Sequence, residues 1–431
     1  IFTDTFMQFN RTIAPPVFEI DPITLTLPEK KILENGLPVH YFKKEQFDLI
    51  HFDLVMTAGT VFQPAPGVAG AVIRLLKKSS PTHSAQEMEQ LIDFYGASWG
   101  IRISDNVLIV RLVIPKSNCE ALLPHLMELI LNPKFKQSDL DVYVSQRITS
   151  LEIDKLEGSY IAREMRDMLL YEENSPYGTI LTKQHYKDLT VNMLESYFER
   201  AINSSTTSLY VAGSIDSSLE KLIESYFSKI KKGEKLLITS PLLKELTPRS
   251  VFHELPDCKQ STVMLFKKGL PHEHPDRESL SFVQTLLHGT PFSRLMNNLR
   301  GKHGLTYGVS GGSLMFFDYS IMIIETEVVK EGTNKAVEQI FFELQRLREE
   351  PVSQEEFKQL VRTVKGKLYR QLNGIVAAMR VYQHGDLFGG GENMVDSAFQ
   401  ALAEFNVEKI QYLANQHLQE TDFFSIVVGQ K

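Results

Sequence analysis

The chain has 431 residues, and its composition is that of an ordinary globular protein: 43% hydrophobic, 23% charged and 10% aromatic. These values exclude disordered and fibrous proteins, and the length predicts roughly two to three domains. The 46 Lys and Arg against 53 Asp and Glu give a net charge of −7, which argues against a nucleic-acid-binding protein. No apolar run approaches the roughly 18 residues that a membrane span requires, so we expect no membrane-spanning segment.

The first half of the chain begins with a Pro-rich stretch, residues 1–30, which predicts an extended N-terminal arm. Alternating apolar residues then predict a strand pair at 37–42 and 49–56. A helix at 67–78 follows, and the capping-box pattern of Ser84 and Glu87 predicts the start of the next helix. The other elements expected in this half are a hairpin over 101–114, helices around 118–131, 138–157, 160–172 and 191–200, a strand at 208–212 and a helix at 217–231.

The second half repeats this order of elements. Ser353 and Glu356 repeat the capping-box pattern, and Ser138 and Asp141 take the corresponding place in the first half. The elements expected in the second half are a strand at 262–267, helices at 277–287 and 293–302, strands within 305–327 around a turn near 317–318, and a long amphipathic helix at 333–349.

The repeated order predicts an internal duplication. We expect two α+β domains, residues 31–230 and 250–431, joined by a linker at 231–249 that is rich in Lys, Pro and Ser. Strands cluster before and after runs of helices instead of alternating with them. This pattern favours, in each domain, a largely antiparallel or mixed sheet with helices packed mainly on one face.

The usual motifs of catalysis and metal binding are missing. Intact HExxH and HxxEH motifs are absent, and none of the 12 His residues belongs to a Ser or Cys nucleophile signature. His272 and His274 flank Glu273, but their spacing on a Pro-flanked loop is poor for a tetrahedral metal site, so a solvated loop is the better interpretation. The three glycines at 389–391 lack the Lys-Ser/Thr of a phosphate loop and predict a flexible turn.

The two cysteines, Cys119 and Cys258, form neither a CxxC pair nor a disulfide framework. We expect both to be small buried hydrophobic residues. Sequons at Asn10 and Asn203 matter only for a chain secreted by a eukaryote. The N-terminal residues have no signal-peptide pattern, and isolated reduced cysteines are compatible with either a cytoplasmic or a periplasmic location.

Residues 292–307, FSRLMNNLRGKHGLTY, resemble the SRLxxxLRxxxGLAY signature of the pitrilysin/insulinase-type peptidases. These proteins are also called inverzincins, and they include the subunits of the mitochondrial processing peptidase. The resemblance extends from about Leu33 to the C-terminus and includes the NGLPV sequence at 35–39 and a Ser-Pro-Tyr-Gly turn at 175–178. It is specific, because several motifs agree in order, and it implies the same duplicated domain arrangement.

The zinc signature of this family, GLAHFLEHMxFKGT, matches residues 67–78, GVAGAVIRLLKK. Gly70 stands in place of the first His, Ile73 in place of the catalytic Glu, and Arg74 in place of the second His. Glycine and isoleucine have no side-chain donor atoms, and an arginine cannot be deprotonated to bind metal. In active relatives the signature Glu is the general base for a zinc-bound water. We therefore expect no metal, no catalytic residue and no peptide hydrolysis from this chain alone.

The resemblance also implies a third zinc ligand, a Glu farther along the chain. Glu152 lies in the expected window, although the sequence leaves its register open. A single carboxylate would not hold zinc without the two histidines.

Arg300 and Tyr307 match the positions that, in active relatives, bind the substrate backbone and stabilise the tetrahedral oxyanion. Arginine offers a permanent charge with forked donors, and tyrosine offers a neutral donor on a rigid ring. The alternative is a solvated arginine at a helix C-terminus and a half-buried tyrosine of a sheet. The surrounding motif favours the functional interpretation. Arg294 is expected to have a structural role.

Some bacterial relatives divide the chemistry between two chains, one with the zinc motif and one with the Arg/Tyr motif. The resemblance therefore implies a non-catalytic, zinc-less subunit of a heterodimeric metallopeptidase. It would close over a homologous partner that holds the zinc, and it would contribute Arg300 and Tyr307 to hydrolysis of a peptide. The alternative is a structural or peptide-binding pseudoenzyme, as a homodimer without proteolytic activity. A third interpretation, an active zinc peptidase, would require about one zinc ion per chain.

Overall fold

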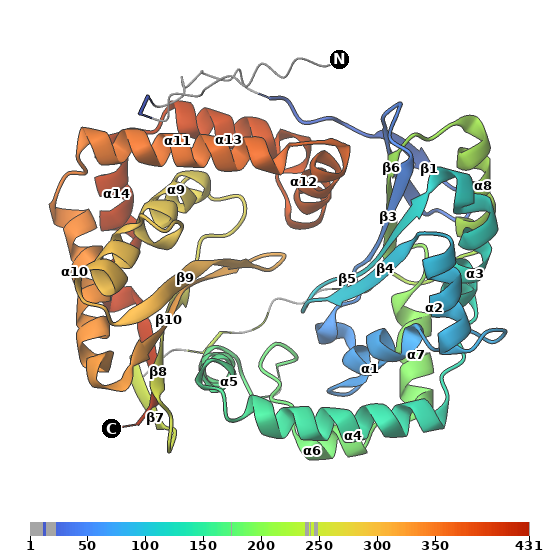
Figure 1. Ribbon diagram of the computed structural model, residues 1–431, viewed down its shortest axis with the longest axis horizontal. Coiled ribbons are helices and arrows are strands. Elements are labelled where there is room, and N and C mark those ends of the chain that lie inside the picture. The colour runs from blue at the N-terminus through green and yellow to red at the C-terminus, as the bar shows by residue number, and fades with distance from the viewer. Residues whose placement is uncertain are drawn as a thin grey trace, which may run out of the picture.

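The computed structural model describes residues 12–13, 23–173, 175–237, 241, 243–244 and 249–430. Two mixed sheets stand on opposite sides of the molecule, and helices cover their outer faces (Figure 1). Most of the arm expected at 1–30, the sequon at Asn10 and part of the linker expected at 231–249 lie outside the described residues.

The first sheet has six strands in the order β1-β2-β6-β3-β5-β4. β2 and β6 are parallel, and the other neighbours are antiparallel. The strands are β1 (Glu29–Ile32), β2 (Pro38–Lys43), β3 (Leu49–Met56), β4 (Ser98–Ile103), β5 (Leu108–Pro115) and β6 (Thr207–Gly213). The expected direct pairing of the strands at 37–42 and 49–56 is wrong, because β6 lies between them. β6 is almost wholly buried, and such a strand needs a neighbour on each side to pair its backbone groups.

The second sheet has the order β7-β11-β8-β10-β9 and repeats the pairing pattern of the first. β7 and β11 are parallel, as β2 and β6 are, and the remaining neighbours are antiparallel. The strands are β7 (Ser250–Glu254), β8 (Gln260–Lys268), β9 (Thr306–Met315), β10 (Ser320–Val329) and β11 (Phe424–Gly429). The order β2-β6-β3-β5-β4 thus corresponds strand for strand to the second sheet. The predicted duplicated α+β fold is confirmed.

The helices of the first half lie close to their expected positions, except for the short α6, which was not predicted. They are α1 (Val68–Leu76), α2 (Ala85–Phe94), α3 (Cys119–Leu131), α4 (Gln137–Asp154), α5 (Gly158–Leu170), α6 (Lys183–Lys187), α7 (Val191–Ala201) and α8 (Ser217–Phe227). The capping box of Ser84 and Glu87 is present at the start of α2. Ser138 does not cap α4, which begins one residue earlier, after Lys136. The expected turn at 175–178 is closed by a 3.1 Å hydrogen bond from the Gly178 amide to the Ser175 carbonyl.

The helices of the second half are α9 (Arg277–His288), α10 (Thr333–Glu349), α11 (Gln354–Gln371), α12 (Ile375–Phe388), α13 (Met394–Ala403) and α14 (Val407–His417). No helix was predicted after residue 371, where α12, α13 and α14 lie. Ser353 caps α11 by accepting a hydrogen bond from the Glu356 amide. The helix expected at 293–302 is a π-helix over Met296–Lys302, a rare conformation that is frequent at functional sites.

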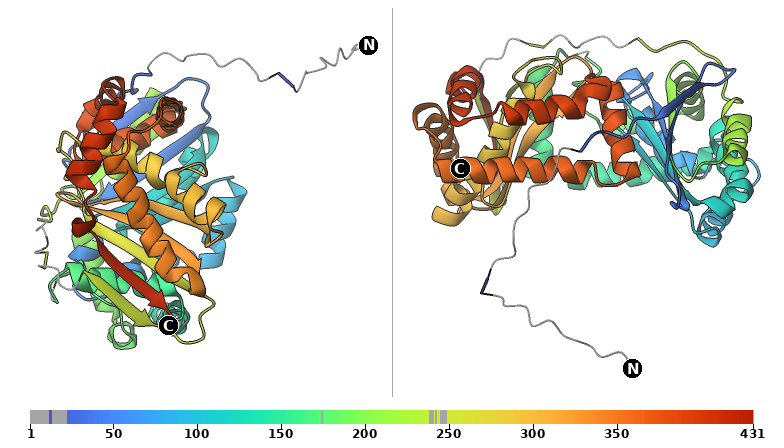
Figure 2. Two further views of the ribbon diagram at one scale, coloured as in Figure 1. Left: turned by 90° about the vertical axis from the view of Figure 1, so that its left-hand side faces the viewer. Right: turned by 90° about the horizontal axis from the view of Figure 1, so that it is seen from above.

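The two halves each contribute one helix to the other half's sheet. α5 packs on the second sheet, where Ile161 and Ala162 join a core with Phe266, Ile321 and other residues of β8, β10 and β11. α12 packs on the first sheet in the same way. The long helices α4 and α11 run along opposite sides of the molecule and lead to these two helices (Figures 1 and 2). The inner face of each sheet is therefore covered in part by the other half.

Cys119 is buried, and burial raises the pKa of its thiol to about 12, which fits the expected hydrophobic role. Cys258 is partly exposed, so the expectation of burial is wrong for this residue. No helix within the described ranges is long and apolar enough to cross a membrane.

Candidate functional site

The positions of the degenerate zinc motif share one face of α1. Gly70, Ile73 and Arg74 are spaced i, i+3 and i+4, which places them on neighbouring turns of the same side. They line a cavity of about 500 Å³ between α1 and α4. The other lining residues are Thr60, Gln63, Gly67, Tyr143, Gln146, Arg147, Ser150, Leu181 and Tyr186.

The residues of this cavity do not fit a zinc ion. A Cβ atom at Gly70 would lie 3.1 Å from the Tyr143 hydroxyl, and burial raises the pKa of that phenol to about 12, so it stays neutral. Arg147 donates to the hydroxyls of Tyr186 (3.4 Å) and Ser150 (3.2 Å). With Arg74, the cavity is lined by two guanidinium groups and by no carboxylate or imidazole. Two fixed positive charges repel a divalent cation, and zinc requires Cys, His, Asp or Glu ligands.

Glu152, the candidate for the third ligand, does not line this cavity. Its carboxylate pairs with the Lys183 ammonium, and its side chain is 54% exposed. Ser150, two residues earlier on α4, faces the cavity instead. Tyr143 and Arg147 are not among the site residues predicted from the sequence. Their i, i+4 spacing, continued toward Ser150, was the available signal for a helix face turned to one side.

Arg300 and Tyr307 lie together on the second half. Arg300 is exposed in the π-helix, and its guanidinium carbon lies 4.8 Å from the centre of the Tyr307 ring, a cation–π contact. Tyr307, near the start of β9, is 85% exposed. Among the described residues neither side chain has a hydrogen bond or an ion pair. The fold therefore leaves the polar groups of both residues free for another molecule.

Tyr307 lies next to an irregular position in the register of the second sheet. Its neighbour Thr306 is paired with Val328, which belongs to the core under the outer helices. The register then shifts between Val328 and Thr326, so Tyr307 lies at an irregularity of the ladder, and its side chain is exposed. The residues that line the α1 cavity all lie within residues 60–186, so the cavity does not include the Arg300–Tyr307 pair.

Arg294 has the structural role expected of it. Its guanidinium donates two hydrogen bonds of 2.8 Å to the Glu356 carboxylate, and the side chain is only 8% exposed. This bidentate ion pair ties the start of the π-helix motif to α11. Arg300, six residues later, therefore sits on a firmly held segment.

The His272–His274 loop is not the solvated loop that was expected, because His272 is buried. Burial and the neighbouring Arg277 lower the pKa of His272 to about 4. The His272 ring packs against Gly389 and Gly390, both at positive φ, and a Cβ at Gly390 would lie 2.8 Å from its Nε2 atom. The expected turn at 389–391 is thus present and serves packing. In the described part of the chain, no three His, Cys, Asp or Glu side chains are grouped so that they could hold a metal ion.

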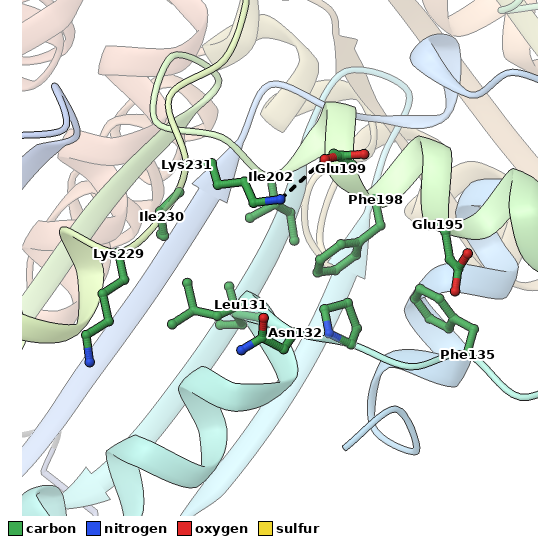
Figure 3. A pocket seen from close by; sticks show the side chains of 12 residues that line it. Leu131, Asn132, Phe135, Glu195, Phe198, Glu199, Ile202, Lys229, Ile230 and Lys231 are labelled. Atoms are coloured by element: carbon green, nitrogen blue, oxygen red, sulfur yellow. Dashed lines mark hydrogen bonds and ion pairs between the residues drawn. The ribbon is translucent and has the colours of Figure 1, made fainter. Parts of the chain in front are cut away.

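A second cavity, of about 480 Å³, lies between the end of α3, α7 and the segment after α8 (Figure 3). Leu131, Phe198 and Ile202 are among its apolar lining residues. Its charged residues are exposed, as in the 3.4 Å ion pair of Lys231 with Glu199. A catalytic site normally holds titratable groups that are buried or strongly coupled. This cavity therefore gives no support to catalysis.

Comparison with known proteins agrees with the geometry. Residues 188–364 match the family model described as "Peptidase M16 inactive domain". The "Probable inactive metalloprotease YmfF" of Bacillus subtilis is 23% identical over 371 residues, which are 80% of this chain and 85% of that protein. An "Uncharacterized zinc protease" of Rickettsia bellii is 20% identical over 349 residues, 78% of this chain and 82% of the relative.

Solved structures show the same fold. The "peptidase M16 inactive domain" structure from Pseudomonas fluorescens aligns with a TM-score of 0.85 at 19% identity and covers 94% of this chain and 98% of its own. A protease structure from Helicobacter pylori aligns with a TM-score of 0.82 at 17% identity and covers 94% and 100%. The chain is similar to the pitrilysin/insulinase-type peptidases over residues 188–364 and shares their fold over most of its length. It is a peptidase-like protein that lacks the zinc ligands at the positions of Gly70, Ile73 and Arg74.

Proposed function

We propose that this chain is the non-catalytic subunit of a metallopeptidase, and that it closes over a homologous partner that holds the zinc ion. The observation that carries this proposal is the Arg300–Tyr307 pair, exposed and free of polar partners in the described part of a molecule whose α1 cavity does not fit zinc. The family's zinc-site chemistry cannot be completed within this chain. Arg300 and Tyr307 can therefore contribute to hydrolysis only where another chain holds the zinc ion.

The chemistry of the pair suits transition-state stabilisation. A tetrahedral intermediate of peptide hydrolysis carries an oxyanion, which is stabilised by donors that are already oriented before reaction. The Arg300 guanidinium offers charged, forked donors, and the Tyr307 hydroxyl offers a neutral one. The cation–π contact of 4.8 Å holds the two groups side by side.

A peptide-binding pseudoenzyme, as a homodimer, is the second candidate, and the sheet edges favour it. β4 and β9 each form the last strand of a sheet, and an edge strand presents unpaired backbone groups to which an extended peptide can add. This mode of binding needs no zinc. The two candidates differ in whether a zinc-bearing chain accompanies this one.

The first experiment is to recover the protein from its native cells and to identify the co-purifying chains by mass spectrometry. The proposal expects a stoichiometric partner of similar size with an intact HxxEH motif. Recovery of this chain with itself alone would contradict the proposal and favour the homodimeric pseudoenzyme.

The role of the pair is tested in the reconstituted complex. Arg300→Ala and Tyr307→Phe are each expected to lower kcat by about 100-fold or more, the usual effect of removing one oxyanion donor, with complex formation unchanged by gel filtration. Tyr412→Phe is the matched control, because Tyr412 is 49% exposed and also lies 4.8 Å from a cation, Lys409. A wild-type rate from the Arg300→Ala complex would refute the assigned role.

A further inference from the structure

The inner face of the first sheet carries a group of arginines. Across the paired strands, Val55 lies beside Ile109, and Ile109 lies beside Arg102. Cross-strand neighbours share a face, and Val55 belongs to the core beneath α12, so Arg102 points to the inner face. The same reasoning applies to Arg111.

Arg111 stands in a second row of the same face. Tyr210, Asp53, Arg111 and Gly100 lie side by side across β6, β3, β5 and β4, and Tyr210 also packs beneath α12. A third arginine, Arg380, is exposed on α12 itself. We call Arg102, Arg111 and Arg380 the inner-face arginine patch.

The part of the face that carries this patch is open. The core beneath α12 is formed with buried residues of β2, β3 and β6, and the partly buried Ile109 of β5 packs against it. In the described part of the chain, no atom lies within 4 Å of a Cβ atom built at Gly100, and Arg102 is exposed. The arginines therefore border free space on the side of the sheet that faces the other half (Figure 1).

The charge of the patch is only partly neutralised. Asp53, fully buried, accepts three hydrogen bonds of 2.8–3.0 Å from Arg111, so its charge is committed to that residue. Arg102 and Arg380 have no hydrogen bond or ion pair among the described residues. Arg380 lies on α12, which packs on this face of the sheet, and burial together with the charges of Arg111 and Arg102 lowers the pKa of Arg380. The patch thus carries a net charge of about +2 on a chain whose overall charge is −7.

We propose that the inner-face arginine patch binds an acidic segment of an extended polypeptide, with carboxylates at alternate positions facing Arg102 and Arg380. The proposal deepens the proposed function by naming the class of substrate, and it rests on the chain being a peptide-binding subunit. A polypeptide is favoured over a nucleic acid for two reasons. The unpaired edge of β4 offers backbone groups that only a polypeptide matches, and the negative overall charge repels a polyanion.

The geometry specifies the pattern of the bound segment. A strand added to β4 points alternate side chains to the inner face, where Arg102 and the open position at Gly100 are its cross-strand neighbours. Opposite charges at such positions attract, and like charges repel. We infer that Glu or Asp at every second position is favoured and that Lys at those positions is rejected.

The test measures binding of three labelled peptides of equal length to the isolated chain by fluorescence anisotropy. Their sequences alternate Thr with Glu, with Gln or with Lys. The Glu peptide is expected to bind at least about tenfold more tightly than the Gln peptide and to weaken steeply from about 50 to about 300 mM NaCl. Equal affinities for the Glu and Gln peptides, or displacement of the Glu peptide by a single-stranded oligonucleotide of equal charge, would overturn the proposal.

Substitutions in the inner-face arginine patch test which arginines bind the acidic peptide. Arg102→Glu and Arg380→Glu are each expected to weaken the Glu peptide about tenfold, and the double variant to prefer the Lys peptide. Arg200→Glu, an exposed change of equal charge on the outer helix α7, is the control. Arg111 is left intact because Asp53 depends on it. Unchanged binding by both single variants would refute the patch.

The outcome is separable from that of the proposed function, because no partner is present in this assay. If the chain does not select the Glu peptide but a zinc-bearing partner is recovered, only the proposed substrate class is refuted. If the chain selects the Glu peptide but no zinc-bearing partner is recovered, the peptide-binding role of the patch is supported and the proposed role as a metallopeptidase subunit is refuted.

Discussion

At the scale of single residues, Asp53 is a fully buried carboxylate whose charge is balanced by Arg111. Removing one member of such a pair leaves an unpaired charge in the protein interior, which is more costly than the pair itself is stabilising. Arg111→Ala is therefore expected to lower the free energy of unfolding by about 3 kcal/mol in urea denaturation. Arg102→Ala, an exposed arginine on the adjacent strand, should change it by less than about 0.5 kcal/mol. Equal losses in the two variants would show that Asp53 does not depend on Arg111.

A second prediction at this scale concerns His288, the last residue of α9. It is 6% exposed, neither ring nitrogen has a hydrogen-bond partner among the described residues, and burial together with Lys367 lowers its pKa to about 4. An unfolded histidine titrates near pH 6.5, so between these values the unfolded state binds more protons. The free energy of unfolding must then fall as the pH drops from about 6.5 to about 4, by up to about 3 kcal/mol from this residue.

The measurement is the urea midpoint at about pH 7 and about pH 4.5. His288→Gln should flatten the decrease, because glutamine takes up no proton. His253→Gln, on an exposed part of β7, is expected to retain the wild-type pH dependence. A His288→Gln variant as acid-sensitive as the wild type would contradict the assignment.

At the scale of elements, the exchange of α5 and α12 between the halves decides how the sheets are covered. Ile375, Met379 and Tyr382 of α12 seal Phe42 and Tyr210 of the first sheet. Directly after α5, the Tyr171 hydroxyl lies 2.9 Å from that of Tyr319, which precedes β10. Each half thus lacks one of its own covering helices, and inner-face residues of both sheets are buried only when the halves are assembled.

Met379→Ala tests the packing of α12. Met379 is fully buried, and truncation of such a side chain typically lowers the free energy of unfolding by about 2–5 kcal/mol because a cavity remains. Arg380→Ala, the next residue on the same helix and exposed, should cost less than about 0.5 kcal/mol. Thermal and urea denaturation measure both. A loss below 1 kcal/mol for Met379→Ala would show that α12 is only loosely attached to the first sheet.

At the scale of the whole molecule, the exchange predicts one cooperative unfolding transition for the two halves. A chain divided within residues 238–248 gives two fragments, each with an uncovered inner face and each with a helix that has lost its sheet. Exposed apolar faces of this kind promote aggregation or a loosely packed state. We expect the separate fragments to lack sharp NMR dispersion and to recover it on mixing. Two fragments that fold independently, with native thermal transitions, would contradict this expectation.

Much of this protein is determined by local sequence. Helix periods, the cap of Ser84 on α2 and the apolar run of β8 depend on residues a few positions apart, so most elements before residue 371 and their duplicated order follow from the sequence alone. The identities at Gly70, Ile73 and Arg74 likewise exclude zinc ligation by those three positions wherever the helix lies, because none of the side chains is a metal ligand.

Tertiary structure decided the features that depend on contacts between distant residues. The insertion of β6 between β2 and β3, the exchange of α5 and α12, and the burial of His272 against Gly389 leave no local signal. Contacts between distant residues also place Arg147 in the α1 cavity and bring Arg102, Arg111 and Arg380 to one face of the first sheet. The sequence by itself determined most of the elements and the loss of the zinc ligands at positions 70, 73 and 74. Only the fold decided which charges meet, because pairing and burial join residues that the chain keeps far apart.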